Sequence, residues 1–250
     1  MSDYNRFGAA ARGVATDRAA VDQGLRAYMI RIYNYMAMGV ALTGVVSWLT
    51  FNAAVTETAG KLALTPFGQT LYSGPVTIVL FLGTLGLVFG ISWMIEKIQP
   101  ATALMLFMLY AALLGLMLSS VFLAYTGTSI TRVFFISAAA FGALSLWGYT
   151  TQRDLSAMGT FLMMGLFGLI IAMVINIFLK SSGLDCVISA AGVLIFAGLT
   201  AWDTQKIKEM YDVNDDGTVA GRKSVMGALT LYLDFINLFL FMLRFLGDRR

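Results

Sequence analysis

The stretch AMGTFLMMGLFGLIIAMVINIFL, residues 157–179, decides the fold class of this sequence. It contains no charged side chain, and charged residues stand just outside it at Asp154 and Lys180. A helix needs roughly 20 consecutive apolar residues to cross the hydrocarbon core of a bilayer. The stretch is long enough to do so, and it is expected to be a transmembrane helix.

The rest of the chain has the same apolar character. Of its 250 residues, 58% are hydrophobic and only 12% are charged, and the mean hydropathy is +0.78. Soluble domains have about 45–50% apolar and about 25% charged residues. A soluble core could not enclose this much apolar surface in a chain of this length. The composition therefore indicates an all-α integral membrane protein with almost no soluble domain.

Gaps between charged residues divide residues 33–250 into seven candidate spans of a single transmembrane domain. Their expected limits are about 33–54, 75–95, 101–125, 133–150, 157–179, 186–203 and 225–246. Most connections between them are short, so consecutive helices are expected to pack antiparallel in a seven-helix bundle. Residues 1–32 form a polar tail that lacks the pattern of a cleavable secretory signal.

The distribution of Lys and Arg predicts the orientation of the chain. With seven spans, the N-terminal tail and three loops share one side and carry most of the basic residues of the connections. Because cytoplasmic segments carry the excess of Lys and Arg, the N-terminus is expected in the cytoplasm. The basic C-terminus, Arg249 and Arg250, does not fit this pattern. It leaves open a re-entrant last segment with both termini in the cytoplasm.

Small residues recur inside the expected spans. The glycines that form this pattern are Gly83, Gly86, Gly90, Gly165, Gly168, Gly192 and Gly198. In lipid, helices associate by close packing at such residues. Packing within the chain is the simpler interpretation, and a dimer face at the GxxxG pair Gly86 and Gly90 is the alternative.

Two acidic residues lie in or at the end of expected spans, Asp203 in the sixth and Asp234 in the seventh. A charge in the hydrocarbon is costly, so such residues face the bundle interior and commonly serve function. At 1.5 Å per residue, Asp234 lies about 13 Å from the start of its helix. Thr200 shares the side of Asp203, and Thr230 and Asn237 share the side of Asp234. The two polar stripes are expected to face each other in the cytoplasmic half of the bundle.

Two carboxyl groups that face each other in a low dielectric cannot both be ionised readily, so the pair is expected to hold one shared proton. When both are charged they repel each other and can bind a cation. When one is protonated they hydrogen-bond and hold two helices together. Because Ca²⁺ prefers oxygen ligands, Asp203 and Asp234 are the candidate metal contacts. In a simpler interpretation, Asp203 caps the membrane edge and Asp234 hydrogen-bonds to Asn237 or Thr230.

Other candidate sites are weaker. The chain has no histidine, which removes histidine-based acid–base catalysis, haem ligation and most zinc sites, and no cofactor is expected. Arg244 lies about 15 Å beyond Asp234 along the same helix and is expected to anchor at the far interface. The run Asp212-Val-Asn214-Asp-Asp216-Gly217 matches the start of a calcium-binding EF-hand loop. Lys223 stands where that loop needs a bidentate Glu, so a solvated turn is the preferred interpretation.

The segments around the two acids resemble the Bax inhibitor family, the transmembrane Bax inhibitor motif proteins. The run ALTLYLDFINLFL, residues 228–240, with Leu243-Arg244 after it, is similar to the last helix of that family. Trp202-Asp203-Thr204-Gln205 is similar to the family element at the end of the sixth helix. The resemblance extends from about residue 25 to the C-terminus.

This resemblance implies a seven-helix fold in which the central last helix is surrounded by the other six. It also implies, for bacterial members, a pH-sensitive calcium leak channel whose paired aspartates act as sensor and gate, here Asp203 and Asp234. Eukaryotic relatives suppress cell death and lower stored calcium. One departure is that residues 75–95 contain no Lys or Arg, so a basic latch inside that helix is not expected.

The leading functional hypothesis is a passive, pH-gated cation leak in a bacterial inner membrane, with Ca²⁺ as the ion and a cytoprotective role implied by the resemblance. The alternative is a non-transporting protein that regulates other membrane proteins through helix contacts. An intramembrane aspartyl protease is disfavoured because Tyr232-Leu233-Asp234 lacks the Gly-x-Gly-Asp pattern of that class. No enzymatic activity and no nucleic-acid partner are expected, and the oligomeric state is left open.

Overall fold

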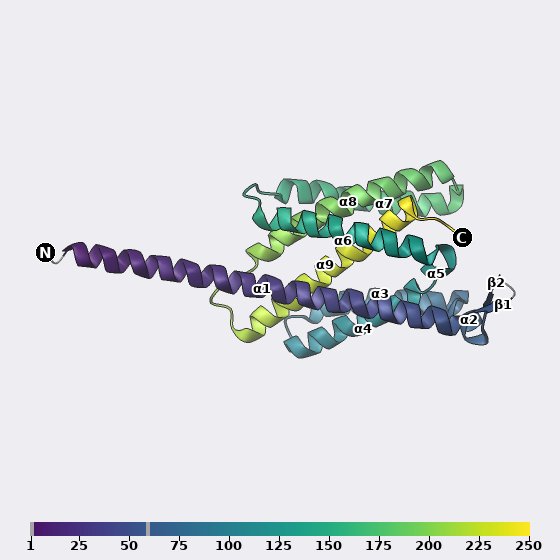
Figure 1. Ribbon diagram of the computed structural model, residues 1–250, viewed down its shortest axis with the longest axis horizontal. Helices are drawn as coiled ribbons and strands as arrows, with labels where there is room; N and C mark the ends of the chain where they lie inside the picture. The colour runs from purple at the N-terminus through teal and green to yellow at the C-terminus, as the bar shows by residue number, and fades with distance from the viewer. Residues whose placement is uncertain (1–2, 59–60) are drawn as a thin grey trace.

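The computed structural model describes the backbone of residues 3–58 and 61–250, and the side chains of residues 22–57 and 62–250. This part of the chain is helical apart from one short hairpin (Figure 1). The elements are α1 (Asp3–Ala54), β1 (Val55–Thr58), β2 (Lys61–Leu64), α2 (Pro66–Leu71), α3 (Gly74–Met94), α4 (Pro100–Leu118), α5 (Val121–Ala124), α6 (Gly127–Thr150), α7 (Ser156–Leu179), α8 (Ser182–Glu209) and α9 (Gly217–Leu246).

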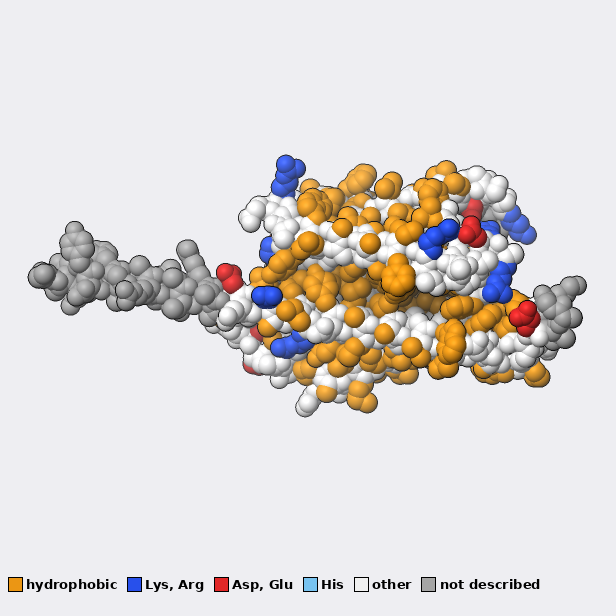
Figure 2. All heavy atoms as spheres, viewed as in Figure 1, with side chains coloured by type: hydrophobic (Ala, Val, Ile, Leu, Met, Phe, Trp, Pro, Cys, Tyr) orange, Lys and Arg blue, Asp and Glu red, His pale blue; other side chains and the backbone are white. Residues whose placement is uncertain are grey.

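Seven helical segments of the described chain are long and apolar enough to cross a membrane: Asp22–Ala54 of α1, α3, Pro100–Ala124, α6, α7, α8 and α9. Hydrophobic side chains cover the flank of the bundle, and charged side chains gather toward its two ends (Figure 2). Trp93 on α3 and Phe178 on α7 are 80% and 78% exposed, as residues that face lipid would be. The predicted all-α, seven-span class is confirmed.

Four helices continue beyond the expected spans, and one of them is α6, which starts at Gly127 instead of Val133. The expected sixth span stops at Asp203, whereas α8 runs on to Glu209 with Thr204 and Ile207 buried against the bundle. The expected seventh span starts at Val225, whereas α9 starts at Gly217. Hydropathy marks the part of a helix that lies in hydrocarbon, and protein contacts extend the helices further. The first span likewise begins before Tyr33, at Asp22.

Some basic residues used for the orientation have side chains outside the described part of the chain, namely Arg6, Arg12, Arg18 and Lys61.

The last helix crosses the whole bundle. α9 is unbroken and its two ends lie at opposite ends of the molecule (Figure 1). The residues after it are fixed beside the start of α6, where the Asp248 backbone N–H donates to Ser129 Oγ (2.9 Å) and Arg132 Nη2 lies 2.9 Å from Asp248 Oδ2. The Arg250 N–H also donates to the Ala124 carbonyl (3.0 Å). α9 therefore has no break at which a re-entrant segment would turn back, and its length and composition suit a full crossing.

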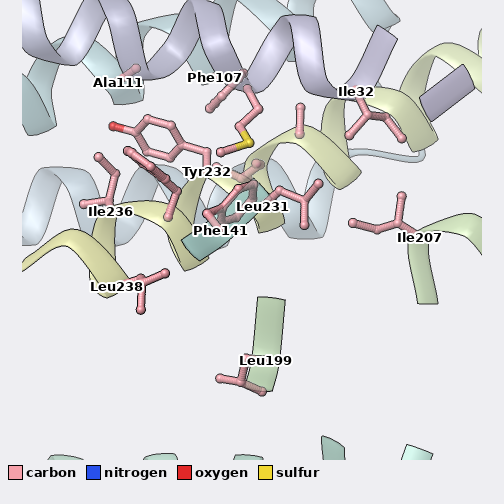
Figure 3. Close-up of a cluster of buried hydrophobic side chains, with 14 of the residues drawn as sticks. Ile32, Phe107, Ala111, Phe141, Leu199, Ile207, Leu231, Tyr232, Ile236 and Leu238 are labelled. Carbon is pink, nitrogen blue, oxygen red and sulfur yellow. The ribbon is translucent and has the colours of Figure 1, made fainter. Parts of the chain in front are cut away.

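The core forms around α9, which is the most buried of the seven spanning helices. Its main partners are α1, α4, α6 and α8, while α3 packs mainly on α4 and α7 mainly on α8. Tyr232 lies at the centre with no exposed surface, in edge contact with the rings of Phe107 and Tyr110 (Figure 3). Its hydroxyl is 2.6 Å from Thr43 Oγ1, which donates to the Ala111 carbonyl (2.8 Å). α9 is thus tied to α1 and α4 by a hydrogen-bonded contact inside an apolar core.

The recurrent glycines divide into two groups. A Cβ at Gly192 would overlap the ring of Phe241, and a Cβ at Gly198 would overlap Leu162, so these two positions do allow close packing as predicted. A Cβ at Gly83, Gly86, Gly90 or Gly168 would meet nothing within 4 Å, so the prediction of a close contact at Gly168 is wrong, and a Cβ at Gly165 would make only an ordinary contact with Ile195. The interpretation of the α3 glycines as packing residues within the chain is therefore wrong, since they lie on an outward face.

α6 and α8 approach each other closely at Gly148, where an added Cβ would overlap the backbone carbonyl of Ala201. Backbone atoms cannot move aside as a flexible side chain can. We expect Gly148→Ala to destabilise the protein by about 1–3 kcal/mol, the usual cost of overpacking. Thermal unfolding in detergent, followed by circular dichroism, measures this as a lower midpoint.

Gly142→Ala is the matched control on the same helix, because a Cβ there meets nothing within 4 Å. Its unfolding midpoint is expected to stay the same or rise, since alanine favours the helix by up to about 1 kcal/mol over glycine. Equal effects of the two substitutions would contradict the close approach at Gly148.

Candidate functional site

A cavity of about 590 Å³ lies between α7, α8 and α9. Most of its wall is apolar and comes from leucine, isoleucine, methionine and phenylalanine side chains. Its polar lining residues are Asp203 from α8 and Thr230, Asp234, Asn237 and Arg244 from α9. The cavity therefore brings together five of the six residues that the sequence singled out.

The two acids meet at this cavity. Asp234 is 5% exposed and Asp203 is half-buried, and their carboxyl groups lie within hydrogen-bonding reach of each other. Asp234 Oδ2 is fully buried and receives no hydrogen bond from the described residues. A buried oxygen without a donor is costly. One proton held between the two carboxyl groups supplies a donor, so the geometry favours a singly protonated pair over two carboxylates.

The neighbouring polar residues do not donate a hydrogen bond to the carboxyl group of Asp234. The Asn237 side-chain amide donates to the Leu233 carbonyl (2.8 Å), and neither Asn237 nor Thr230 hydrogen-bonds to Asp234. The simpler interpretation, in which these two residues hold the acid, is therefore wrong. Thr200 is fully buried, donates to the Phe196 carbonyl (2.7 Å) and does not line the cavity.

Arg244 lies at the other end of the same cavity, about 15 Å along α9 from Asp234. It forms an ion pair with Asp185, in the first turn of α8, and Arg249 Nη2 lies 3.5 Å from the same carboxylate. Arg244 thus sits at the far end of its helix, as an anchor would. Its ion pair with Asp185 was not predicted, because the two residues are far apart in the sequence.

The segment around Asp203 presents each side chain to a different partner. Gln205 is buried and joins α8 to the α6–α7 loop, because its Oε1 accepts the Leu155 N–H and its Nε2 donates to the Arg153 carbonyl, both at 2.8 Å. Trp202 packs against Gly159 of α7, where any Cβ would overlap the indole. These contacts hold the end of α8 in place, and with it the carboxyl group of Asp203.

Thr204 belongs to a buried chain of hydroxyl groups. It donates to the Thr200 carbonyl (2.7 Å), so its oxygen accepts from Ser145 Oγ (2.9 Å), which in turn accepts from the Tyr33 hydroxyl (2.6 Å). This assignment follows because each hydroxyl has a single proton to donate. The chain links α1, α6 and α8 next to Asp203. Sequence reasoning missed it, since serine and threonine on separate helices carry no pattern of their own.

The EF-hand-like run is a turn fixed by its own hydrogen bonds. Asp212 Oδ1 accepts from the backbone and side-chain amides of Asn214, which hold the pKa of this exposed carboxyl below its usual value. Asp216 caps the start of α9 by accepting from two backbone N–H groups. Lys223 reaches back to Asp215 Oδ2 (2.6 Å) and to the Met210 carbonyl (2.9 Å). Among the described residues no group of three or more acidic, His or Cys side chains could hold a metal ion.

Removal of the Gln205 amide should free the α6–α7 loop. Gln205→Leu leaves the buried Leu155 N–H without an acceptor, at a cost of about 1–3 kcal/mol, and we expect faster hydrogen exchange at the amides of residues 153–156. Gln205→Glu keeps the acceptor but loses the donor to Arg153, so an intermediate exchange rate is expected. Exchange in both variants equal to that of the unsubstituted protein would show that the loop is held by other contacts.

Comparison with known proteins gives the family. The family model described as inhibitor of apoptosis-promoting Bax1 matches residues 25–250. An uncharacterised protein of Rickettsia prowazekii is 49% identical over 92% of each chain. The inner membrane protein YbhL of Escherichia coli K12 is 44% identical over 91% of this chain and 94% of its own length. The chain therefore belongs to the Bax inhibitor-1 family of multi-pass membrane proteins.

Proposed function

We propose that this protein is a pH-sensitive passive leak channel for cations, with Ca²⁺ as the ion, and that Asp203 and Asp234 form its gate. The observation that carries the proposal is the contact of two acids at one end of a cavity inside a membrane bundle. A buried acid pair is costly to keep in a membrane and marks an ion or proton pathway. Membership of the Bax inhibitor-1 family supports a role in the membrane, but it does not identify the transported ion.

The gate would work through one proton. With a proton between the acids, a hydrogen bond joins α8 to α9 and the cavity closes at this end. Loss of that proton leaves two charges that repel each other, which favours separation of the helices and attracts a cation. Asp203, Asp234, Asn237 and Thr230 all line this cavity, and their carboxylate, amide and hydroxyl oxygens are ligands of the kind that Ca²⁺ takes. Ca²⁺ is here the transported ion.

The proposed location is the bacterial inner membrane, with the N-terminus in the cytoplasm. The name of the E. coli relative, an inner membrane protein, supports this location. The excess of Lys and Arg in the N-terminal tail and in the loops on the same side supports the orientation. The Asp203 and Asp234 pair then lies in the cytoplasmic half and senses cytoplasmic pH. The proposal gives the acid pair no catalytic role. A cytoprotective role would come from the control of calcium levels by the leak.

The interaction hypothesis remains the second candidate, on the basis of one observation. Gly83 and Gly86 are exposed on α3, and neither touches another part of the described chain. Small residues of this kind permit a helix of another membrane protein to pack closely. Absence of ion flux from folded, inserted protein would favour this candidate.

The test is calcium entry into dye-loaded proteoliposomes from about pH 5 to about pH 8, a scan across which the proposed shared proton is lost. We expect the flux to rise with pH as the shared proton is lost. Asp203→Asn and Asp234→Asn each put an amide in place of the protonated acid, which donates a hydrogen bond at every pH. Each variant is therefore expected to show a low flux that does not respond to pH.

Asp212→Asn is the matched control, because it removes the same charge from an exposed turn outside the cavity. It should keep the flux and the pH response. A pH response that survives in both cavity variants would contradict the gate, and flux no greater than that of empty liposomes would contradict the channel. Loss of flux in Asp212→Asn alone would point to the turn instead.

A further inference from the structure

The seam between α1 and α6 is not closed by helix packing. The two helices lie side by side (Figure 1), yet α1 packs mainly on α4 and α9, and α6 packs mainly on α8 and α9. Two cavities follow the seam, one of about 540 Å³ that includes Tyr33 and Tyr149 and one of about 180 Å³ that includes Val40 and Thr131. Figure 2 shows a hollow with a hydrophobic floor between the two helices.

The larger of these cavities, called the furrow below, is open to the surrounding lipid. Ile30 and Leu146 line it and are 48% and 62% exposed, while Phe141 lines it from the core side. Its volume is typical of sites for small molecules, which occupy roughly 300–1,000 Å³. The hydroxyls of Tyr33 and Ser145 reach the furrow but are hydrogen-bonded to each other at 2.6 Å. The wall therefore suits a hydrocarbon chain and offers little to a polar ligand.

One end of the furrow is positively charged. Arg26 lines it directly, and Lys208 Nζ lies 5.6 Å from the ring centroid of Tyr149, another lining residue, and donates to its carbonyl. None of the described residues that line the furrow is acidic. A basic pocket between transmembrane helices at their basic end is the usual setting for an anionic lipid head group.

We infer that the furrow binds an anionic phospholipid of the surrounding membrane, with one acyl chain between α1 and α6 and the phosphate at Arg26. The apolar wall, the lateral opening and the cationic end each match one part of such a molecule. This site shares no lining residue with the cavity of the acid pair. The inference therefore stands whether or not the protein conducts ions.

Photo-crosslinking tests the site directly. The full-length protein is placed in phosphatidylcholine nanodiscs that contain a small fraction of phosphatidylglycerol with a diazirine on its acyl chain, and labelled peptides are identified by mass spectrometry. We expect labelling to concentrate at Met29–Tyr33 and at 141–149. Unlabelled phosphatidylglycerol should compete for these positions, and additional phosphatidylcholine should not.

Gly142→Trp fills the furrow, because a side chain at this lining position meets no atom within 4 Å of its Cβ. We expect labelling of the furrow to fall markedly, because the indole occupies the space that the acyl chain needs. Gly86→Trp is the matched control on the open, lipid-facing side of α3 and should leave the labelling unchanged. Gly142→Leu, a smaller change, should give a partial loss and serves if the tryptophan variant does not fold.

Arg26→Gln tests the head group. It should remove the competitive advantage of phosphatidylglycerol over phosphatidylcholine. Arg153→Gln is the control, because Arg153 lies at the same end of the bundle but does not line the furrow, and it should leave that advantage unchanged. Labelling spread evenly over α3, α7 and the other exposed helices would overturn the inference. Equal competition by both lipids in the unsubstituted protein would overturn the assignment of an anionic head group.

Discussion

A carboxyl group inside a membrane bundle needs a partner within the protein, and Asp203 of α8 and Asp234 of α9 meet this constraint by lining one cavity together. Helices in a membrane can be held together by close packing and by hydrogen bonds, and an acid on either helix needs a partner inside the protein. Each acid here has the other as a neighbour at the cavity between α7, α8 and α9. In the proposed gate, this contact holds only while the two acids share a proton.

The surroundings of this pair are fixed more firmly than the pair itself. Gln205 ties the end of α8 to the α6–α7 loop, Thr204 joins a chain of hydroxyls that reaches α1, and Arg244 is paired with Asp185 at the other end of the cavity. These contacts have complementary donors and acceptors and do not need a shared proton. A change at Asp203 and Asp234 can therefore occur within an otherwise intact bundle.

The position of α9 explains why cavities lie on two of its sides. Four helices pack closely on α9, whereas α7 packs mainly on α8, and the backbones of α1 and α6 stay apart although Tyr33 hydrogen-bonds to Ser145 across the seam. The space between α7, α8 and α9 is lined by acids at one end, and the furrow between α1 and α6 has a basic end and an apolar wall. The first space also has Arg244 at its other end, whereas none of the described residues that line the furrow is acidic.

The sequence alone determined the membrane class, the seven spans and the two acids, because a long uncharged stretch and a charge within one are local signals. It could not decide where α8 begins and ends or where α9 begins, since protein contacts extend these helices beyond the hydrocarbon. Only the tertiary structure showed that the α3 glycines face outward and that Arg244 pairs with Asp185. It also revealed the hydroxyl chain and the furrow. These features depend on which faces of distant helices meet, and that is set by packing across the whole bundle.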